Sequence, residues 1–394
     1  MEKTENKLIR AYSWSFLSDG ILISSISLFV LSSGGSAAEG AFLAGIFNLP
    51  WLLISIFSGN IIDKYCPFKI LYTSNVFRII ILSAILSINF LGFYNFSVLI
   101  FLFFLLGSCD VFYENTLPTI APKIFPKNLK DFNRRFEFFS KFLRMIVGKA
   151  IGPVLISISP SLTFLICSIL FFVTVLNIYS MPSIEIKKES TIEEGIRPAF
   201  RWITEHKYFL KLIGMSSINN ALFASLIAFL PTHLKINLNE SNFHSGLTLS
   251  MMGLGYILGA KYLSVISTFN LRQVYISTAT GISFAVLSIG FSQQIFVIHI
   301  SMIFFGFAMS IRNITNWTHM QKIIPQNIIG RVTALQRTCG WGACSIGPLL
   351  GSFSIKYTGM QASLIYLGYL SILGFCISLT MFKDSLNDSI ASNT

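Results

Sequence analysis

The stretch KIFPKNL at residues 123–129 returns almost unchanged as KIIPQNI at residues 322–328. Each copy precedes a Gly-Pro pair in an apolar segment, at residues 152–153 and 347–348. The two repeats are 199 and 195 residues apart, close to half of the 394 residues. A chain that repeats itself in order at half its length is predicted to contain two copies of one structural unit.

Composition indicates that this unit is a bundle of membrane-spanning helices. Hydrophobic residues make up 53% of the chain and charged residues 12%, against roughly 25% charged residues in a soluble domain. A soluble chain of this length could not bury so much apolar surface, whereas a bilayer requires it. The net charge of +12 is spread between apolar segments, which favours orientation in a membrane over binding of nucleic acid.

Twelve mostly apolar segments are each long enough to cross a bilayer as a helix. They are predicted at residues 11–32, 40–62, 70–91, 97–119, 137–158, 161–181, 209–232, 244–266, 272–291, 294–315, 331–355 and 360–382. The predicted fold class is therefore an all-α membrane protein, with twelve transmembrane helices in two pseudo-symmetric bundles of six. The first apolar run continues into a full span, so we expect no cleavable signal peptide.

Positive charge is distributed unequally between the connections. Of the 29 Lys and Arg residues, only Lys235 and Lys356 lie in connections from odd to even spans, whereas the other connections and the two ends are rich in bases. By the positive-inside rule both termini are predicted to be cytoplasmic. We therefore expect a multi-pass protein of the cell inner membrane.

The longest connection lies at the midpoint of the chain and is mixed in charge. It divides the chain into a first six-helix bundle at residues 1–181, a cytoplasmic linker at 182–207 and a second six-helix bundle at 208–394. Within the linker, Thr191 to Lys207 is predicted to form an amphipathic surface helix. Both bundles start on the same side of the membrane, which makes the repeat a parallel one.

The connection between spans 2 and 3 contains the pattern GNIIDK, which begins at Gly59 and is followed by Lys69. Gly59 would let two helices approach closely, and Asp63 would accept hydrogen bonds at a neighbouring helix N-terminus. Lys64 and Lys69 would lie at the inner surface. Contacts of this kind can stabilise one conformation of two bundles, so these residues are predicted to act in gating.

Span 5 contains the pattern GKAIGP, which begins at Gly148. Gly148 and Gly152 lie on one helix face, and Pro153 removes a helix hydrogen bond, which predicts a closely packed helix that can bend. Gly347 and Pro348 in span 11 are predicted to have the same role in the second half.

These patterns resemble those of the major facilitator superfamily, whose members have six plus six spans and a central cytoplasmic loop. GNIIDK resembles that family's signature between spans 2 and 3, and GKAIGP resembles the glycine-rich pattern of its drug–proton antiporters. PQNIIGRV at residues 325–332 is similar to the loop before span 11 in the enterobactin-exporter and macrolide-efflux branch. The resemblance implies a secondary transporter that works by alternating access.

Polar side chains inside the spans are candidates for transport, because a charge in the bilayer needs a partner or a water-filled cavity. The candidates for proton coupling or substrate binding are Asp19, Arg78, Asp110, Glu114, Arg144, Lys149, Asn219, Asn220, Arg312 and Asn313. Asp110 and Glu114 are one turn apart and share a helix face. Two carboxylates buried together suit the loading and release of a proton. The alternative is that they pair with Arg144 or Lys149 and lock span 4 to span 5.

Three other candidates also have two interpretations. Asp19 is either a substrate or proton site or a packing residue that forms hydrogen bonds within its own span. Arg78 either takes part in transport, or it has a structural role in which it snorkels to the membrane surface or pairs with Asp63 or Asp19. Arg312 lies near the inner end of its span, where gating or surface pairing competes with substrate contact.

Signals of enzyme activity are lacking. The sequence has no phosphate-binding loop and no arrangement of nucleophile, histidine and acid. The six cysteines have no metal-ligand spacing and are expected to be reduced packing residues. We therefore predict no enzyme activity, no cofactor and no metal site.

The function predicted from the sequence is proton-coupled export of an amphipathic small molecule, either a hydrophobic drug or a siderophore. The expected partners are the substrate, protons and the lipid bilayer, with no nucleic acid, and a monomer suffices. An uptake permease of the same superfamily is the nearest alternative. A non-transporting membrane receptor or scaffold is the alternative from another class, and the free-energy cost of buried carboxylates argues against it.

Overall fold

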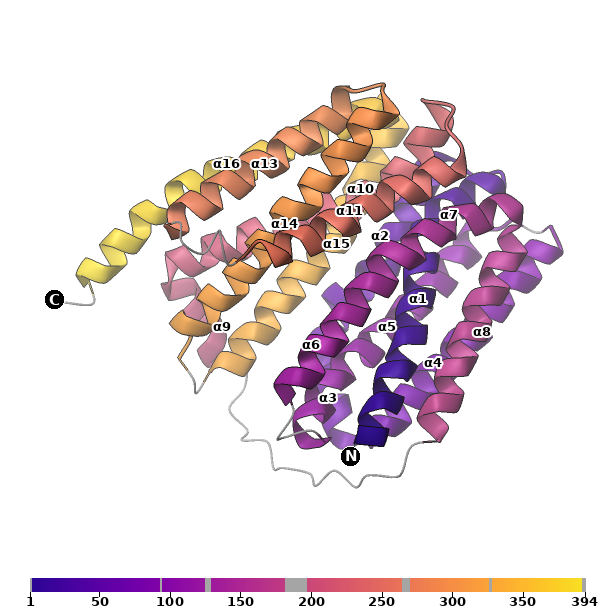
Figure 1. Ribbon diagram of the computed structural model, residues 1–394, viewed down its shortest axis with the longest axis horizontal. Coiled ribbons are helices and arrows are strands. Elements are labelled where there is room, and N and C mark those ends of the chain that lie inside the picture. The colour runs from indigo at the N-terminus through magenta and orange to yellow at the C-terminus, as the bar shows by residue number, and fades with distance from the viewer. Residues whose placement is uncertain are drawn as a thin grey trace.

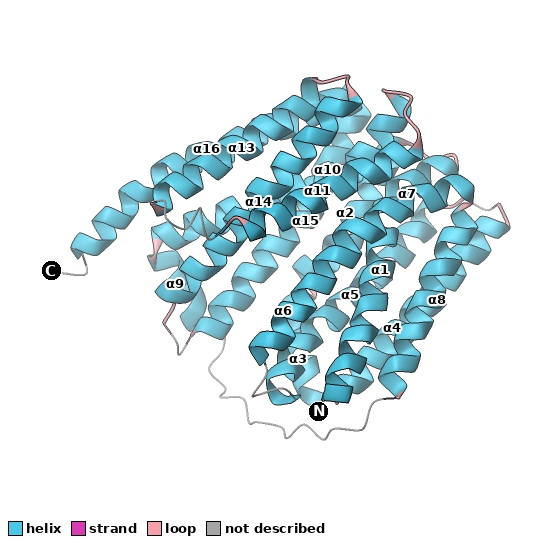
Figure 2. Cartoon of the chain, in the orientation of Figure 1, coloured by secondary structure: helices cyan, strands magenta, loops and turns pink. Residues whose placement is uncertain are grey.

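The computed structural model describes residues 2–92, 94–124, 129–180, 197–263, 270–325 and 328–391, without the side chains of 2–4, 60, 63, 118, 119, 122, 123, 130, 321, 322, 330 and 381–391. Every regular element in these ranges is a helix (Figure 2). The two copies of the repeated KIFPKNL stretch lie partly outside the described residues, and residues 182–196 of the predicted linker lie wholly outside them.

The helices form the predicted two bundles, which lie side by side (Figure 1). The first bundle contains α1 (Glu2–Ser32), α2 (Ala37–Leu53), α3 (Ser55–Lys64), α4 (Pro67–Phe90), α5 (Phe96–Ile124), α6 (Leu129–Phe139), the π-helix η1 (Ser140–Gly148), α7 (Lys149–Ile158) and α8 (Pro160–Tyr179). The second contains α10 (Lys207–Ile236), α11 (Asn242–Lys261), α13 (Leu271–Phe291), α14 (Ile295–Ile323), α15 (Ile329–Thr358) and α16 (Met360–Ala391). The short helix α9 (Arg197–Glu205) precedes them, with Ala199 and Ile203 buried and Phe200 exposed.

Span 2 is not the single helix predicted at residues 40–62. Pro50 lies inside α2, which ends at Leu53, and α3 begins at Ser55. Proline lacks the N–H of a regular helix and its ring crowds the preceding turn, so a break within the following turn is the physical reason for the difference.

Span 5 also departs from a regular helix, because its middle part is a π-helix between α6 and α7. The expected bend at Pro153 lies within α7, but the larger irregularity comes earlier, at Ser140–Gly148. A π-helix places an extra residue in each turn and is often found at functional sites.

The two bundles meet most extensively at two contacts. α2 packs on α15, and η1 and α7 pack on α11. At the first contact a Cβ added to Gly45 would lie 2.6 Å from Leu349 Cγ, and at the second a Cβ added to Gly253 would lie 2.7 Å from Met145 O. Ser250 Oγ also donates a hydrogen bond to Ile146 O across the second contact (3.0 Å).

The cores of the bundles are shared at one end only. A hydrophobic core formed by both bundles contains Val30 of α1 and Leu230 of α10, near the ends of these helices. Near their starts, which we call the terminal end, Tyr12 belongs to a core of the first bundle alone and Phe209 to a core of the second bundle alone. The cleft between the bundles is therefore closed at the far end and opens toward the terminal end.

Among the described residues, eight helices are long and apolar enough to cross a membrane. They correspond to predicted spans 1, 3, 4, 6, 7, 9, 10 and 12. The remaining four spans, 2, 5, 8 and 11, form the most extensive contacts between the bundles, although α1 and α10 also pack against each other. A helix that faces another bundle and a cleft contacts less lipid than its neighbours and can carry more glycine, proline and polar residues.

Candidate functional site

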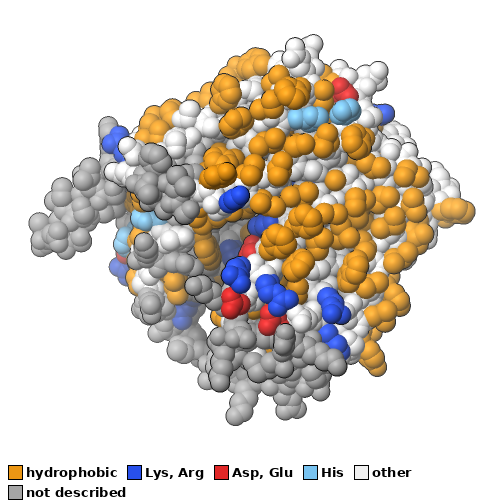
Figure 3. All heavy atoms as spheres, in the orientation of Figure 1, with side chains coloured by type: hydrophobic (Ala, Val, Ile, Leu, Met, Phe, Trp, Pro, Cys, Tyr) orange, Lys and Arg blue, Asp and Glu red, His pale blue; other side chains and the backbone are white. Residues whose placement is uncertain are grey.

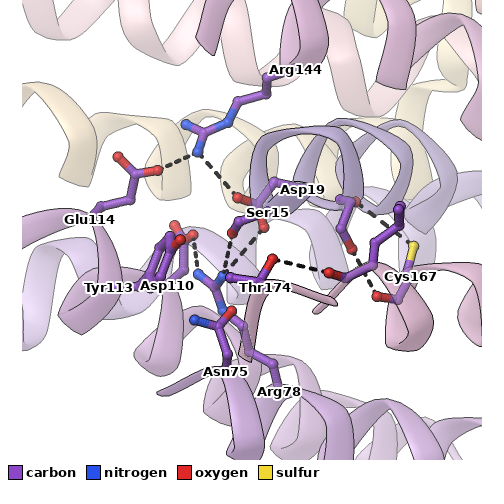
Figure 4. Close-up of polar contacts among 12 residues, drawn as sticks. Ser15, Asp19, Asn75, Arg78, Asp110, Tyr113, Glu114, Arg144, Cys167 and Thr174 are labelled. Atoms are coloured by element: carbon purple, nitrogen blue, oxygen red, sulfur yellow. Dashed lines mark hydrogen bonds and ion pairs between the residues drawn. The ribbon is translucent and has the colours of Figure 1, made fainter. Parts of the chain in front are cut away.

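Five charged side chains from four parts of the first bundle converge beside the cleft (Figure 4). Asp19 comes from α1, Arg78 from α4, Asp110 and Glu114 from α5, and Arg144 from η1. We call these five residues the carboxylate–arginine cluster. All of them were predicted as candidates from the sequence.

Arg78 forms the buried side of the cluster, with a side chain that is 1% exposed. Its Nη2 donates a hydrogen bond to Asp110 Oδ1 (2.7 Å), and its Nη1 lies 3.7 Å from Asp19 Oδ1. Nη1 also donates to Ser15 Oγ (3.1 Å). The guanidinium lies 4.8 Å from the ring centroid of Tyr113. The predicted pairing of Arg78 with Asp19 is thus present, and Asp110 is a second partner that the sequence did not indicate.

Arg144 forms the opposite side. Its Nη2 donates to Asp19 Oδ2 (3.1 Å) and to Glu114 Oε1, and its guanidinium lies 4.6 Å from the ring centroid of Phe16. The pairing of Glu114 with Arg144 is one of the two interpretations drawn from the sequence. Asp110 does not pair with Arg144, because it pairs with Arg78 instead.

The cluster is reached from the cleft on one side. The side chains of Arg144, Glu114 and Asp110 are 20%, 18% and 14% exposed, whereas that of Asp19 is 3% exposed. Figure 3 shows charged side chains gathered around a hollow in the surface. Water and protons can therefore reach the outer carboxylates while Asp19 stays covered.

The charges of the cluster do not balance. Three carboxylates face two guanidinium groups, so a single proton makes the cluster electroneutral. Oxygens of the three carboxylates lie within 4.8 Å of one another, a spacing that could hold a metal ion. The two guanidinium groups already contact all three acids, so the arrangement fits proton binding better than a metal.

Glycines bring the helices of the cluster together. A Cβ added to Gly148 would lie 2.7 Å from Gly20 Cα, so the backbones of η1 and α1 touch, and Arg144 can then reach Asp19. A Cβ on Gly152 would lie 2.8 Å from Ser25 Oγ. The close packing predicted for these two glycines is present, and Pro153 is buried in the next turn. In the second half, a Cβ on Gly347 would lie 2.6 Å from Ala221 O, and the neighbouring Pro348 lies inside α15.

The predicted gating residues between spans 2 and 3 have fewer contacts. Gly59 is exposed, and no described atom lies within 4 Å of a Cβ added there, so the prediction that it allows close helix packing is wrong for this structure. Lys64 and Lys69 are also exposed. The side chain of Asp63 lies outside the described residues.

Lys149 is separate from the cluster. It is buried, its Nζ lies 4.7 Å from the ring centroid of Phe223 on α10, and Nζ has no hydrogen-bond partner among the described residues. The interpretation that it pairs with Asp110 or Glu114 is therefore wrong. Its helix turns it toward the second bundle instead.

The candidates of the second half form no such cluster. Arg312 is buried, contacts Met215 Sδ and lies 5.5 Å from the ring centroid of Tyr275. Asn313 Nδ2 donates weakly to Tyr256 Oη (3.5 Å). Asn219 is buried and Asn220 half-buried in α10.

Trp51 is a site residue that the sequence did not reveal. Its Nε1 donates to Asp110 Oδ2 (3.2 Å), and its ring stacks on Trp341 of α15, with centroids 5.3 Å apart. This pair joins the cluster directly to the second bundle. A tryptophan in an apolar helix is usually a packing or interface residue. The feature of the sequence that could have drawn attention to Trp51 was its position directly after Pro50.

Known proteins share this fold. Solved structures similar to the chain include the nucleoside transporter NupG (13% identity, TM-score 0.79, 96% of this chain and 99% of that one). A bacterial homologue of the human lysosomal transporter Spinster in an inward-facing, occupied conformation is also similar (11%, 0.77, 98% and 98%). So is a D-xylose–proton symporter (13%, 0.74, 96% and 95%). A search of curated protein sequences finds no significant match.

The sequence itself matches the family profile described as Major Facilitator Superfamily over residues 8–348. This range includes the whole carboxylate–arginine cluster and most of both bundles. The chain therefore belongs to the Major Facilitator Superfamily, and it is a membrane transporter rather than an enzyme.

Proposed function

We propose that the protein exports an amphipathic small molecule, a drug or a siderophore, in exchange for protons. The observation that carries this proposal is the carboxylate–arginine cluster, which has one carboxylate in excess and is reached from the cleft. A buried group that can accept one proton beside a mobile contact between bundles is what coupling requires.

The orientation of the cleft follows from the distribution of bases. With both termini in the cytoplasm of an inner-membrane protein, the terminal end is the inner end, and the structure corresponds to an inward-open state. The bundles, with residues 182–207 between them, would rock about the contacts of α2 with α15 and of η1 and α7 with α11. A monomer contains all of these parts.

Protonation would bias the two states through the contacts of the cluster. A proton on Asp110 or Glu114 weakens an ion pair with Arg78 or Arg144. Because Asp110 also accepts a hydrogen bond from Trp51, which stacks on the second bundle, its charge affects the contact between bundles. The exchange of an inbound proton for an outbound solute would follow from this bias.

Transport by purified protein in lipid vesicles tests the proposal. A catecholate siderophore and a hydrophobic dye serve as probes, and a pH gradient is imposed across the vesicle membrane. We expect flux only with the gradient and against the direction of proton movement, and none in the Asp110→Asn, Glu114→Gln double variant. Asp131→Asn is the matched control, because Asp131 is an exposed acid outside the cluster.

Each other result has a definite meaning. Full activity of the double variant, or flux without a gradient, would contradict proton coupling by this cluster. Flux in the direction of the protons would make the protein an uptake permease. A protein that moves neither probe nor protons would support a receptor or scaffold.

A further inference from the structure

Lys149 is a buried cation without a partner. Its side chain is 2% exposed, and its Nζ makes no hydrogen bond within the described part of the chain. Burial of an unpaired ammonium costs free energy. We therefore expect such a group to be retained only where another interaction offsets that cost. Arg144, five residues earlier, shows the contrast, since it contacts two carboxylates.

The surroundings of Lys149 come from both bundles. Its ammonium lies 4.7 Å from the ring centroid of Phe223, a half-buried side chain of α10. The charged groups that act on it most are Arg144 and Lys141, which are both cations, and the thiol of Cys344 on α15 lies nearby. The charged groups that act most on Lys149 are therefore both cations, and one wall of its surroundings is aromatic.

Each described carboxylate of the cluster beside the cleft already has a cationic partner. All three carboxylates of the cluster are in contact with guanidinium groups. On the opposite side, Arg337 of α15 forms no ion pair within 4 Å and no hydrogen bond to any described residue. Its electrostatic interactions with Glu114 and Glu137 act at longer range. A cationic solute would find no free carboxylate there, whereas an anionic solute would find two cations that lack partners.

We infer that Lys149 and the ring of Phe223 bind the negatively charged group of the transported molecule, which is an amphipathic organic anion. The ammonium supplies the counter-charge, and the aromatic wall contacts the apolar body of the solute. Because Phe223 belongs to the second bundle, rocking of the bundles covers or uncovers the ammonium. This inference rests on the proposed transport function and selects anions among its possible substrates.

Equilibrium binding of a matched probe set tests it. Dansylglycine, dansylamide and dansylcadaverine carry one fluorophore with a negative, neutral and positive group, and energy transfer from tryptophan reports binding to purified protein. We expect the anion to bind most tightly, and Lys149→Met to weaken its binding about tenfold while the neutral probe is unaffected. Lys149→Arg should restore most of the affinity, because it restores the charge.

Arg201→Met is the control, since Arg201 is an exposed cation of α9 that pairs with Glu205 and is not among the surroundings of Lys149. It should leave binding of the anion unchanged. Preference of the wild-type protein for dansylcadaverine, or an anion affinity that is equal in Lys149→Met, would overturn the inference.

The binding assay requires no gradient, so it separates this inference from the transport proposal. Binding of the anion that depends on Lys149, together with a failure of proton-driven flux, would refute coupling and leave the anion site standing. Proton-driven flux of the cationic probe alone would refute the anion site and leave coupling standing.

Discussion

The two bundles contain the same kind of arginine–tyrosine contact but surround it differently. In the first bundle Arg78 on the third span faces Tyr113 on the fourth, with 4.8 Å from guanidinium to ring centroid. In the second bundle the partners are exchanged, because Tyr275 lies on the ninth span and Arg312 on the tenth, at 5.5 Å. Only Arg78 also has carboxylate partners.

The acids account for this difference. After Lys207 the sequence contains three acidic residues, Glu240, Asp384 and Asp388, and none of them lies within a predicted span. The repeat therefore preserves helix packing in both halves, while the carboxylates within predicted spans are confined to the first. The comparison indicates that both halves share the same helix packing, whereas the carboxylates that can bind protons within the membrane lie in the first half.

The largest expected effect comes from removal of Arg78, and removal of Arg312 is the comparison. Arg78→Met should lower the free energy of unfolding by about 3–5 kcal/mol, because it leaves buried carboxylates without compensation. Arg312→Met should change it by about 1 kcal/mol or less, because no acid depends on it. Thermal unfolding in detergent measures both. Equal losses of stability would show that the two arginines have the same environment, against the comparison.

A carboxylate placed beside Arg312 would make the second half resemble the first. Met215→Glu replaces the side chain that contacts Arg312. We expect a coupling free energy of about 2 kcal/mol between Met215→Glu and Arg312→Met in a double-mutant cycle of unfolding, because the new acid pairs with the arginine. Additive effects of the two changes would mean that Arg312 cannot accept an acidic partner.

Substitution of Lys149 should change the free energy of unfolding in the opposite direction to substitution of Arg78. Lys149→Met removes an unpaired buried charge and should raise the free energy of unfolding by about 1–2 kcal/mol. Lys141→Met, which changes a partly exposed lysine of the same segment, should have little effect. A loss of stability in Lys149→Met would indicate that the ammonium has a partner in the protein.

The smallest expected effect concerns the link between the bundles. Trp51→Phe removes the hydrogen bond to Asp110 and should cost about 1 kcal/mol, with the aromatic stack largely kept. Trp341→Phe is the matched change on the second bundle and removes no such hydrogen bond to the cluster. Equal shifts in the unfolding temperature would show that stacking alone matters.

Much of the fold could be predicted from the sequence, because twelve apolar runs and a repeat at half the length leave few alternatives. Two of the four spans at the contact between bundles, spans 2 and 5, were less regular than predicted. Pro50 was visible in the sequence, but its effect depends on whether neighbouring helices accommodate the break. The π-helix that carries Arg144 contacts α1 where Gly148 meets Gly20, and this contact between distant segments is not visible in the sequence.

The site was predictable in composition but not in its pairings. Intramembrane charge identified all five residues of the cluster. Spacing along one helix cannot say that Asp110 pairs with Arg78 and Glu114 with Arg144, because the partners lie on three other segments. The isolation of Lys149 and the role of Trp51 depend on which way η1, α7 and α2 face. The expectation for Gly59 failed because its helix face meets no described neighbour.

Infrared difference spectroscopy during a pH titration tests the central claim most directly, since the carbonyl stretch of a protonated carboxyl group reports where the proton is held. In the wild-type protein we predict such a band from a site shielded from bulk water, and we predict its loss in the Asp110→Asn, Glu114→Gln double variant but not in Asp131→Asn. A band that persists unchanged in the double variant, or that is absent from the wild type, would contradict storage of the proton by the carboxylate–arginine cluster.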